Sequence, residues 1–474
     1  MNYIFIGNGI TSLSTAFRLI QSSANVSKII IVGKNKRLGS ATLAAPAMLN
    51  SFCEVEDGLL KNEINLIKFN MSREASDLWP GFIKEISQFK ISKNEKKKID
   101  EKLNRGTFLI NNASADSLDD LNYEAIINAL KKFKEPYDEV KARNIPGYKP
   151  SESDRSNRAI YIKNEGWINS SFTLDTLEKT LRKNNRVSFI NDNVIELVQN
   201  NNKIDYIILE SGEKISADKY ILASGANVSD LLYKSNIDIK IPRIFYGVGV
   251  SLNLTNIDSN LKQCIRTPNR GLACGIYAVP FSNSLDEHKL VLGATNFIST
   301  KPIFKSRIID TQSLLNNFVN QINNDSYKAN IDKINVGWRP TSADTYPLIG
   351  KTTLLNLIIA SGTKRDGFHL APLISKILVS IIKNEKIDRC YDYFRPEREL
   401  IKTLSRNDAI NKSVSHLLSA AYQHDFNPGL ITIKNKLHIQ IKEDLERLHD
   451  KVGAFDWGIP TEMIDMYRYN HIKY

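Results

Sequence analysis

The most constraining feature of this chain is its first 32 residues, whose pattern is that of a strand, a glycine turn, a helix and a second strand. An apolar run at residues 3–6 ends in Gly7-Asn8-Gly9-Ile10-Thr11-Ser12, and apolar residues at helical spacing follow. A second apolar run covers residues 28–32. Strands that are apolar along their whole length are typical of a parallel sheet with helices on both faces. The sequence therefore predicts an α/β fold that begins with a Rossmann-type βαβ unit.

The glycine turn itself is suited to a dinucleotide. Gly7 permits the tight turn, and Gly9 lets the backbone approach a pyrophosphate at the positive end of the following helix. Ser12 stands at the third position of the motif and is small enough for close packing of the helix on the strand. A tight structural turn without a ligand is the alternative interpretation.

The end of the second strand departs from the usual dinucleotide-binding pattern. An acidic residue commonly holds a ribose hydroxyl there, but this chain has Gly33-Lys34-Asn35-Lys36-Arg37. The basic cluster could pair with a 2′-phosphate, as in NADP binding. Alternatively, backbone groups or Asn35 could hold the ribose. The sequence leaves both interpretations open.

The 474 residues are about three times the typical ~150-residue domain, so two or three domains are expected. Residues 58–160 read as mainly helical and polar, with an apolar island at 106–110. Strand patterns between residues 187 and 223 predict a meander, and residues 240–300 alternate as in a half-buried antiparallel sheet. We expect a discontinuous nucleotide-binding domain, an inserted substrate domain and a helical C-terminal extension. The boundaries predicted for these three units are 1–80, 160–235 and 335–395; 81–159 and 236–334; and 396–474.

Charge and cysteine content narrow the class of protein. The net charge of +12 raises the question of a nucleic-acid or anionic membrane partner. The basic residues are spread along the chain, and even the densest run, residues 93–105, contains acidic residues, so we expect a solvated surface and no nucleic-acid partner. The four cysteines, none in a CxxC pair, exclude a disulfide scaffold or a zinc ribbon. They indicate reduced thiols.

The sequence also bears on cellular location and on metal binding. The first residues do not form a signal peptide, and the apolar stretch at residues 370–382 is too short to span a bilayer and fits a buried helix. We therefore expect a cytoplasmic protein without a membrane span. Five of the seven histidines lie after residue 396, without the spacing of metal ligands, so no metal site is predicted.

Over about residues 1–395 the chain resembles the FAD-dependent oxidoreductases of the D-amino-acid oxidase superfamily, in the pattern of glycine oxidase and sarcosine oxidase. Several segments carry this resemblance in the same order as in the family. They are GNGITS, GSATLAAPAML (39–49), GWINSSFTLDTL (166–177), ILASGAN (221–227), YAVPF followed by KLVLGATN (277–296), GWRPTSADTYPLIG (337–350) and GTKRDGFHLAP (362–372).

The resemblance implies FAD as cofactor. It implies non-covalent attachment of FAD, because no cysteine lies near the segment GWRPTSADTYPLIG, which contains Arg339. The residues it assigns to the cofactor run from the glycine turn to the segment that closes over the flavin edge. They are Gly7, Gly9, Ile10, Thr11, Ser12, Gly33, Lys34, Ser40, Ala41, Thr42, Ala47, Met48, Val194, Gly225, Gly362, Lys364, Asp366, Gly367 and Phe368.

The resemblance also implies a substrate site. Arg339 matches the arginine that binds a substrate carboxylate in this family, and its planar fork suits that task. Arg365 is a second candidate, and Tyr277 could line the pocket. As alternatives, each arginine could form an ion pair at a domain interface, and Tyr277 could be a core aromatic. His369 is more simply a packed histidine at a helix start.

The implied reaction is oxidation of a C–N bond in an amine or amino acid, including an amine on a biosynthetic intermediate. A hydride passes to flavin N5, and the imine is then hydrolysed, so no side chain is assigned as catalytic. Two alternatives are an NADP-linked oxidoreductase and a non-catalytic flavin-fold binding protein. The expected partner is a small-molecule amine or amino acid. The C-terminal helices could form a homo-oligomer or cover the active site.

Overall fold

The computed structural model describes residues 1–22, 24–88, 103–257, 260–273, 275–281, 289–424, 426 and 428–472. Cys274 and most of the basic run at residues 93–105 lie outside this range, so the structure does not test what the sequence predicts for them.

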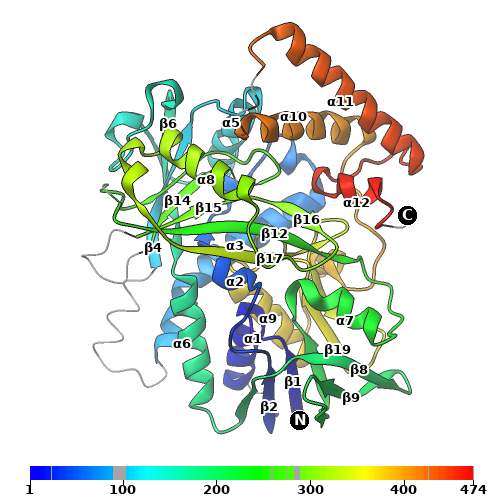
Figure 1. Cartoon of the computed structure of the whole chain (residues 1–474). Coiled ribbons are helices and arrows are strands. Elements are labelled where there is room, and N and C mark those ends of the chain that lie inside the picture. The colour runs from blue at the N-terminus through cyan, green and yellow to red at the C-terminus, as the bar shows by residue number, and fades with distance from the viewer. Residues whose placement is uncertain are drawn as a thin grey trace.

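A six-stranded sheet forms the lower half of the molecule (Figure 1). Its order is β18-β19-β11-β1-β2-β7, and every pair is parallel except that of the edge strand β18. The α/β class and the opening strand–helix–strand unit predicted from the sequence are confirmed. The strands are β1 (Asn2–Ile6), β2 (Lys28–Val32), β7 (Val187–Ile190), β11 (Lys219–Leu222), β18 (Leu348–Lys351) and β19 (Leu357–Ser361).

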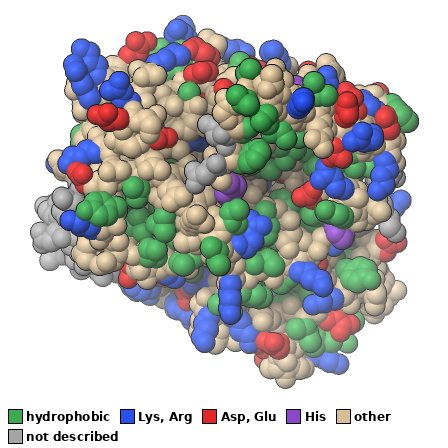
Figure 2. All heavy atoms as spheres, turned by 45° about the horizontal axis from the view of Figure 1, so that its top comes forward, with side chains coloured by type: hydrophobic (Ala, Val, Ile, Leu, Met, Phe, Trp, Pro, Cys, Tyr) green, Lys and Arg blue, Asp and Glu red, His purple; other side chains and the backbone are tan. Residues whose placement is uncertain are grey.

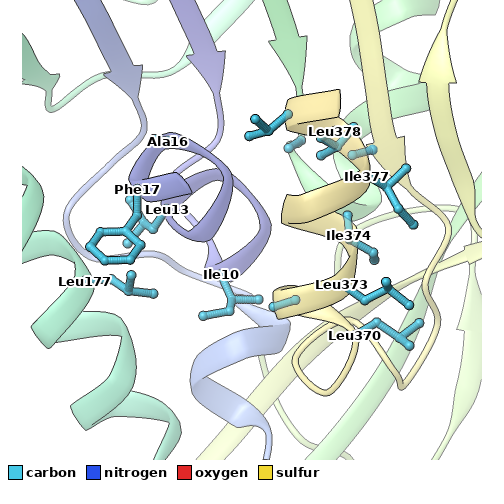
Figure 3. Close-up of a cluster of buried hydrophobic side chains, with 14 of the residues drawn as sticks. Ile10, Leu13, Ala16, Phe17, Leu177, Leu370, Leu373, Ile374, Ile377 and Leu378 are labelled. Carbon is cyan, nitrogen blue, oxygen red and sulfur yellow. The ribbon is translucent and has the colours of Figure 1, made fainter. Parts of the chain in front are cut away.

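The two faces of this sheet are covered by different layers, and strand β1 shows why. Successive side chains of a strand point to opposite faces. Tyr3 and Phe5 pack against helices, whereas Ile4 and Ile6 pack against a small meander sheet. Figure 3 shows the helical side, where Ile10 lies toward the apolar helix that was predicted at residues 370–382, and Leu13 and Phe17 lie toward Leu177. The helices of this layer are α1 (Ile10–Gln21), α3 (Glu63–Gln88), α6 (Ser170–Arg182) and α9 (Ala371–Ile382).

The opposite layer comes from the meander predicted between residues 187 and 223. That prediction was wrong for its first and last strands, because β7 and β11 pair within the parallel sheet. Its strands β8, β9 and β10 form a separate antiparallel sheet. Leu197, Ile207 and Leu209 of this sheet are fully buried against the parallel sheet. The elements of this layer are β8 (Val194–Asn200), β9 (Lys203–Leu209), β10 (Lys214–Ile215), η5 (Gly225–Asn227) and α7 (Val228–Lys234).

A second, ten-stranded sheet forms the upper half and is antiparallel apart from the β4–β13 pair. Its longest pairing joins β12 to β17 over almost their whole length. Residues 58–160 contribute more strand than the sequence suggested, because β4 and β6 pair with each other at long range. The strands are β3 (Met48–Leu49), β4 (Leu103–Asn111), β5 (Tyr137–Val140), β6 (Arg158–Ile168), β12 (Ile244–Thr255), β13 (Cys264–Arg266), β14 (Tyr277–Pro280), β15 (Leu290–Gly293), β16 (Phe297–Ser299) and β17 (Asn330–Ser342).

Short helical elements connect these strands, and two longer helices pack on the second sheet. Those two are α5 (Ser117–Lys132) and α8 (Ile308–Gln321). The short elements are α2 (Ala41–Ala44), η1 (Phe52–Glu54), η2 (Leu59–Lys61), η3 (Ala142–Asn144), η4 (Glu152–Asp154), η6 (Asn324–Lys328) and η7 (Arg389–Phe394).

The C-terminal segment is helical, as predicted, and packs on the body of the protein (Figure 1). Phe245 and Ala343 of the body share a buried cluster with Val414, Leu445 and Met463. The elements are α10 (Arg406–Gln423), α11 (Ile431–Lys451), η8 (Thr461–Met463) and α12 (Ile464–Arg468).

Two surface properties bear on the expected partners. On the face shown in Figure 2, basic and acidic side chains are interspersed, which is the pattern of a solvated surface. In the part of the chain that the structure describes, no helix combines the length and the apolar character needed to cross a membrane.

Candidate functional site

A cavity of about 1220 Å³ lies between the two sheets, at the carboxyl ends of β1 and β2. This edge of an open parallel sheet is where such folds bind ligands. The cavity brings together almost all residues predicted from the sequence, although they come from distant segments. Those lining it are Gly7, Gly9, Ile10, Thr11, Gly33, Lys34, Ser40, Ala41, Thr42, Ala47, Met48, Val194, Gly225, Tyr277, Arg339, Lys364, Arg365, Asp366, Gly367 and Phe368; Ser12 and Gly362 do not line it.

The glycine turn has the geometry of a phosphate-binding loop. Gly7 has φ +112°, and a Cβ there would lie 2.5 Å from the carbonyl oxygen of Ala223, so a side chain has no room. A Cβ on Gly9 would meet only Thr42 Oγ1, at 3.6 Å, and would otherwise point into open space. Helix α1 begins here without a side-chain cap and without an acidic residue in its first turn. The positive end of its dipole is therefore available to an anion.

One serine hydroxyl near this loop supports a bound ligand. The Oγ of Ser224, which follows β11 and lines the cavity, is buried and has no hydrogen-bond partner among the described residues. Because buried polar groups normally have partners, this hydroxyl and the open space beside Gly9 fit a polar cofactor. The Oγ of Ser12 is also without a partner among these residues, but Ser12 does not line the cavity.

Two of the three basic residues that follow β2 are already paired with carboxylates. Lys34 Nζ lies 2.9 Å from Asp192 Oδ1 and 2.9 Å from Glu210 Oε2. These partners raise the pKa of Lys34 above its ordinary value through their hydrogen bonds. Arg37 is paired with Glu178. A 2′-phosphate would have to compete with these carboxylates, so the arrangement does not favour the NADP interpretation.

Sequence reasoning missed Asp192, which supplies a carboxylate at this point of the cavity. No acidic residue follows β2 directly, but Asp192, two residues after the neighbouring strand β7, lines the cavity at this edge of the sheet. Its carboxylate accepts hydrogen bonds from the backbone of Asn193 and Ser211. The usable signal was its position directly after a predicted strand, but that strand was assigned to the meander and not to the parallel sheet.

Arg339 lies at the other end of the cavity, on β17. Its Nη1 donates to the carbonyl oxygen of Thr295 at 2.9 Å and to Asn296 Oδ1 at 3.1 Å. Gly249 on the paired strand β12 makes room for the guanidinium, because a Cβ there would lie 2.2 Å from Nη1. In the described part of the chain, no carboxylate forms an ion pair with Arg339. Its charge faces the cavity without an acidic partner from these residues.

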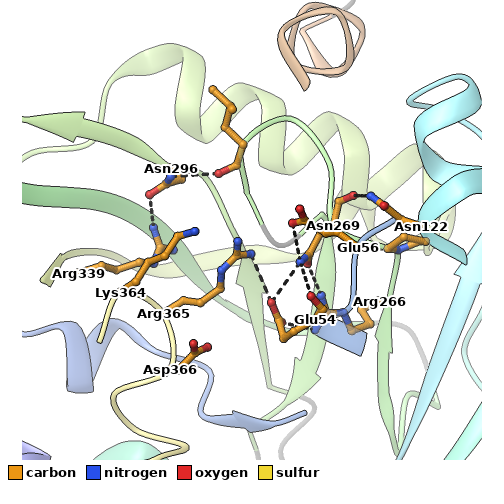
Figure 4. A network of polar contacts seen from close by, with 12 residues as sticks. Glu54, Glu56, Asn122, Arg266, Asn269, Asn296, Arg339, Lys364, Arg365 and Asp366 are labelled. Carbon is orange, nitrogen blue, oxygen red and sulfur yellow. Dashed lines mark hydrogen bonds and ion pairs between the residues drawn. The ribbon is translucent and has the colours of Figure 1, made fainter. Parts of the chain in front are cut away.

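Arg365 differs from Arg339 because carboxylates surround it (Figure 4). Its guanidinium lies 3.3 Å from Glu54 and 3.7 Å from Glu462. The adjacent Lys364 is paired with the same Glu462, at 2.5 Å. These contacts agree with the alternative interpretation of Arg365, in which its guanidinium forms an ion pair at a domain interface. Glu462 belongs to the C-terminal extension, and nothing local in the sequence indicated its place beside the cavity.

The next residues of this segment are fixed by helix α3. Asp366 pairs with Lys68 at 3.0 Å. The ring of Phe368 stacks on Trp79, with 5.2 Å between the ring centroids. These contacts hold the segment that the sequence placed at the flavin edge.

His369 lines the cavity but is bound on both ring nitrogens. Nε2 lies 2.8 Å from the Ser76 hydroxyl and Nδ1 lies 3.3 Å from that of Ser72. Burial lowers the pKa of His369 to about 4, so the imidazole is neutral at pH 7. This environment is that of a packed histidine.

Tyr277 and Asn50 line the substrate side of the cavity. Tyr277 is buried on β14, with its ring over Gly293, where a Cβ would lie 2.2 Å from the phenol oxygen. Asn50 was missed by sequence reasoning, although it directly follows the segment 39–49. It is 3 % exposed, and neither its amide nitrogen nor its amide oxygen has a partner among the described residues. Such a group is suited to contact a ligand.

The cysteines bear on how a flavin would be attached. Cys53 and Cys264 are buried, and burial raises the pKa of both thiols, that of Cys264 to about 12. Thiols of this kind are poor nucleophiles. No cysteine lines the cavity in the described residues, and Cys274 lies outside them.

A buried carboxyl behind the site predicts a pH effect on stability. Glu165 accepts hydrogen bonds from the backbone of Phe52 and Cys53, yet burial prevails and raises its pKa to about 7. The folded protein therefore holds this proton more tightly than the unfolded chain between pH 4.5 and 7. Raising the pH through this window should lower the free energy of unfolding by up to about 3 kcal/mol.

Urea unfolding of the wild type and of Glu165→Gln at pH 5 and pH 8 checks this expectation. In the variant, most of the difference in the free energy of unfolding between pH 5 and pH 8 should disappear. Glu124→Gln, a half-exposed partner of Arg158, is the control and should keep that difference. An equal pH dependence in wild type and Glu165→Gln would show that Glu165 does not titrate in this window.

The fold and the cavity define a class of protein: a dinucleotide-dependent oxidoreductase built from a Rossmann-type sheet and a second, substrate-side sheet. A family model described as FAD dependent oxidoreductase (DAO) matches residues 3–381. The chain belongs to this family, and its cofactor is FAD. The resemblance to the D-amino-acid oxidase superfamily found in the sequence is thereby confirmed.

Curated relatives match parts of the chain. A D-amino acid dehydrogenase of Vibrio vulnificus (strain CMCP6) is 28 % identical over 202 residues, which are 42 % of this chain and 45 % of the relative. A bifunctional protein ThiO/ThiG of Trichormus variabilis (strain ATCC 29413 / PCC 7937) is 27 % identical over 119 residues, 25 % of this chain and 18 % of the relative. The chain thus spans less than half the length of each of these two relatives.

Solved structures are similar over most of the chain. Glycine oxidase from Geobacillus kaustophilus has a TM-score of 0.68 at 18 % identity, covering 84 % of this chain and 99 % of its own. Iminodiacetate oxidase from Chelativorans sp. BNC1 has a TM-score of 0.67 at 17 % identity, covering 84 % and 100 %. At this identity the likeness shows the shared fold.

Proposed function

We propose that the protein oxidises the C–N bond of an amine or amino acid that carries a carboxylate. The observation that carries this proposal is Arg339, a cavity-lining guanidinium without an acidic partner in the described residues. A planar guanidinium binds a carboxylate through two parallel hydrogen bonds. The similar proteins include a D-amino acid dehydrogenase and a glycine oxidase, whose names are consistent with such a substrate.

The residues divide between cofactor and substrate along the cavity. The glycine turn and the N-terminus of α1 would hold the pyrophosphate of FAD, and Asp192 and Lys34 lie where the ribose is expected. Segment 362–369 would close over the flavin edge. Cys53 and Cys264 are poor candidates for attachment, so we propose non-covalent FAD.

The chain's own residues orient the substrate and exclude water. Arg339 would fix the carboxylate, Tyr277 and Met48 would form the apolar wall, and Asn50 would contact the amine or the ring system. When bound, FAD supplies the acceptor for a hydride from the carbon that carries the nitrogen, and the imine product is hydrolysed in water. His369 is neutral and hydrogen-bonded, so we assign it no proton transfer.

The test is a visible absorbance spectrum of the purified protein, followed by acid precipitation. A flavin spectrum whose colour passes into the supernatant supports non-covalent FAD. The protein is then mixed with amines and amino acids without oxygen, and bleaching of the flavin band identifies substrates; peroxide and dye assays identify the acceptor. A colourless protein that FAD does not stabilise would instead support a non-catalytic binding protein.

A further inference from the structure

We propose that Glu462, contributed by the C-terminal extension, sets the charge preference of the substrate end of the cavity. By holding Lys364 and Arg365, it leaves Arg339 as the site for one carboxylate and disfavours a second. This inference rests on the proposed function, because it concerns the same site. It assigns a specificity-determining role to a residue beyond the matched family region, which ends at residue 381.

The first support is the geometry of the ion pairs. Lys364 and Arg365 both line the cavity, as Arg339 does (Figure 4), and the backbone N–H of Lys364 donates to the carbonyl oxygen of Pro340, the residue after Arg339, at 2.8 Å. Glu462 Oε2 lies 2.5 Å from Lys364 Nζ, and Oε1 lies 3.7 Å from Arg365 Nη2. Glu462 itself does not line the cavity. It therefore acts on a substrate through these two cations.

The second support is the state of the carboxyl group. The side chain of Glu462 is only 12 % exposed. Burial alone would raise its pKa, but the attraction of Lys364 and Arg365 outweighs burial and lowers it. Glu462 is therefore ionised at neutral pH, and its charge acts in a poorly solvated environment, where electrostatic effects are strong.

The third support is the rigid mounting of Glu462. Its neighbours Thr461 and Met463 are buried, and the Thr461 hydroxyl lies 3.0 Å from that of Ser413 on α10. Lys412 on the same helix pairs with Glu56 of the body at 2.6 Å. The extension is thus held on both sides of Glu462.

Glu54 does not replace Glu462 as the partner of these cations. It is shared between Arg365 and Arg266, with 2.7 Å to the latter, and no contact between Glu54 and Lys364 is found among the described residues. Removing the charge of Glu462 would leave Lys364 without its carboxylate and Arg365 with a shared one. Burial lowers the pKa of Lys364, and loss of Glu462 removes the attraction that opposes this shift. Arg365, whose guanidinium keeps its charge, is therefore the cation that would turn to a second anionic group in the cavity.

The experiment compares Glu462→Gln, which removes the charge but keeps the size, with the wild-type holoenzyme. Malonate and acetate serve as probes with two and one carboxylates, and binding is followed by the perturbation of the flavin spectrum. The ratio of the acetate Kd to the malonate Kd should rise at least about tenfold in the variant. Glu462→Asp, which keeps the charge, should restore most of the wild-type ratio.

Asp465→Asn is the matched control, because it removes one negative charge three residues away. Asp465 is paired with Arg468 at the surface, and the ratio should not change. Should Glu462→Gln not fold, Glu462→Met, which is similar in size and also uncharged, is measured instead.

Two results would overturn the proposal: an unchanged ratio in the uncharged variants, or the same rise in Asp465→Asn. Failure of the proposed function itself would give different results. In that case Arg339→Ala leaves acetate binding unchanged, or no amine or amino acid bleaches the flavin.

Discussion

Arg339→Ala is expected to raise KM for a carboxylate-bearing substrate by about 100-fold, with bound flavin and kcat largely retained. Removing one partner of a desolvated charge pair costs about 2–5 kcal/mol, and this cost falls on substrate binding rather than on the cofactor. Arg339 contacts only Thr295 and Asn296 through its guanidinium, so its loss breaks no ion pair among the described residues. Steady-state kinetics with the substrate found in the bleaching screen checks this expectation.

Arg158→Ala is the control for loss of an arginine elsewhere. Its guanidinium is half-exposed and pairs with Glu124 on the surface, so KM should not change. A normal KM in Arg339→Ala together with a raised KM in Arg365→Ala would move the carboxylate site to Arg365. The same change in both variants would indicate that the two arginines act together.

Gly9→Ala is expected to weaken FAD binding at least tenfold while leaving the stability of the apoprotein unchanged. The added Cβ meets only Thr42 Oγ1, at 3.6 Å, and otherwise enters the open space beside the start of α1. In the apoprotein this contact is an ordinary one. A pyrophosphate that must approach the backbone there would be displaced. Fluorescence titration of the apoprotein with FAD and thermal unfolding without FAD give the two quantities.

Two further glycine substitutions serve as comparisons for Gly9→Ala. A Cβ on Gly81, in α3, would meet nothing within 4 Å, so Gly81→Ala should affect neither FAD binding nor folding adversely. Gly7→Ala should lower the stability of the apoprotein itself, because of the φ of +112° and the contact with Ala223. Normal FAD affinity in Gly9→Ala would remove the glycine turn from the pyrophosphate site.

Local signals were sufficient for the nucleotide half of the fold. Strand β1, the glycine turn, α1 and β2 are contiguous, and each has a pattern that follows from burial or backbone geometry alone. The same holds for α9, whose apolar residues are buried as its composition suggests. Short-range reasoning therefore located the glycine turn at the edge of the cavity, whereas the residues assigned to it from Ser40 onward came from the family resemblance.

Contacts between distant segments could not be predicted in this way. Asp192 meets Lys34 only because β7 pairs with β2 in the folded sheet. Strands β4 and β6 are separated by a helix and a loop, so their pairing gives no local signal. Glu462 lies almost a hundred residues from Lys364, in a segment whose sequence pattern indicated only helices.

The strand order of the parallel sheet has a consequence for the synthesis of the protein. The central strand β1 lies between β2 and β11, and β11 in turn requires β19, which ends at residue 361. A growing chain thus carries one edge of β1 unpaired until β11 is made, and then one edge of β11 unpaired until β19 is made. Such edges and their apolar faces are prone to aggregate. The parallel sheet therefore cannot be completed before residue 361 has been made, and nascent chains of this protein should need chaperone protection for longer than their N-terminal motif suggests.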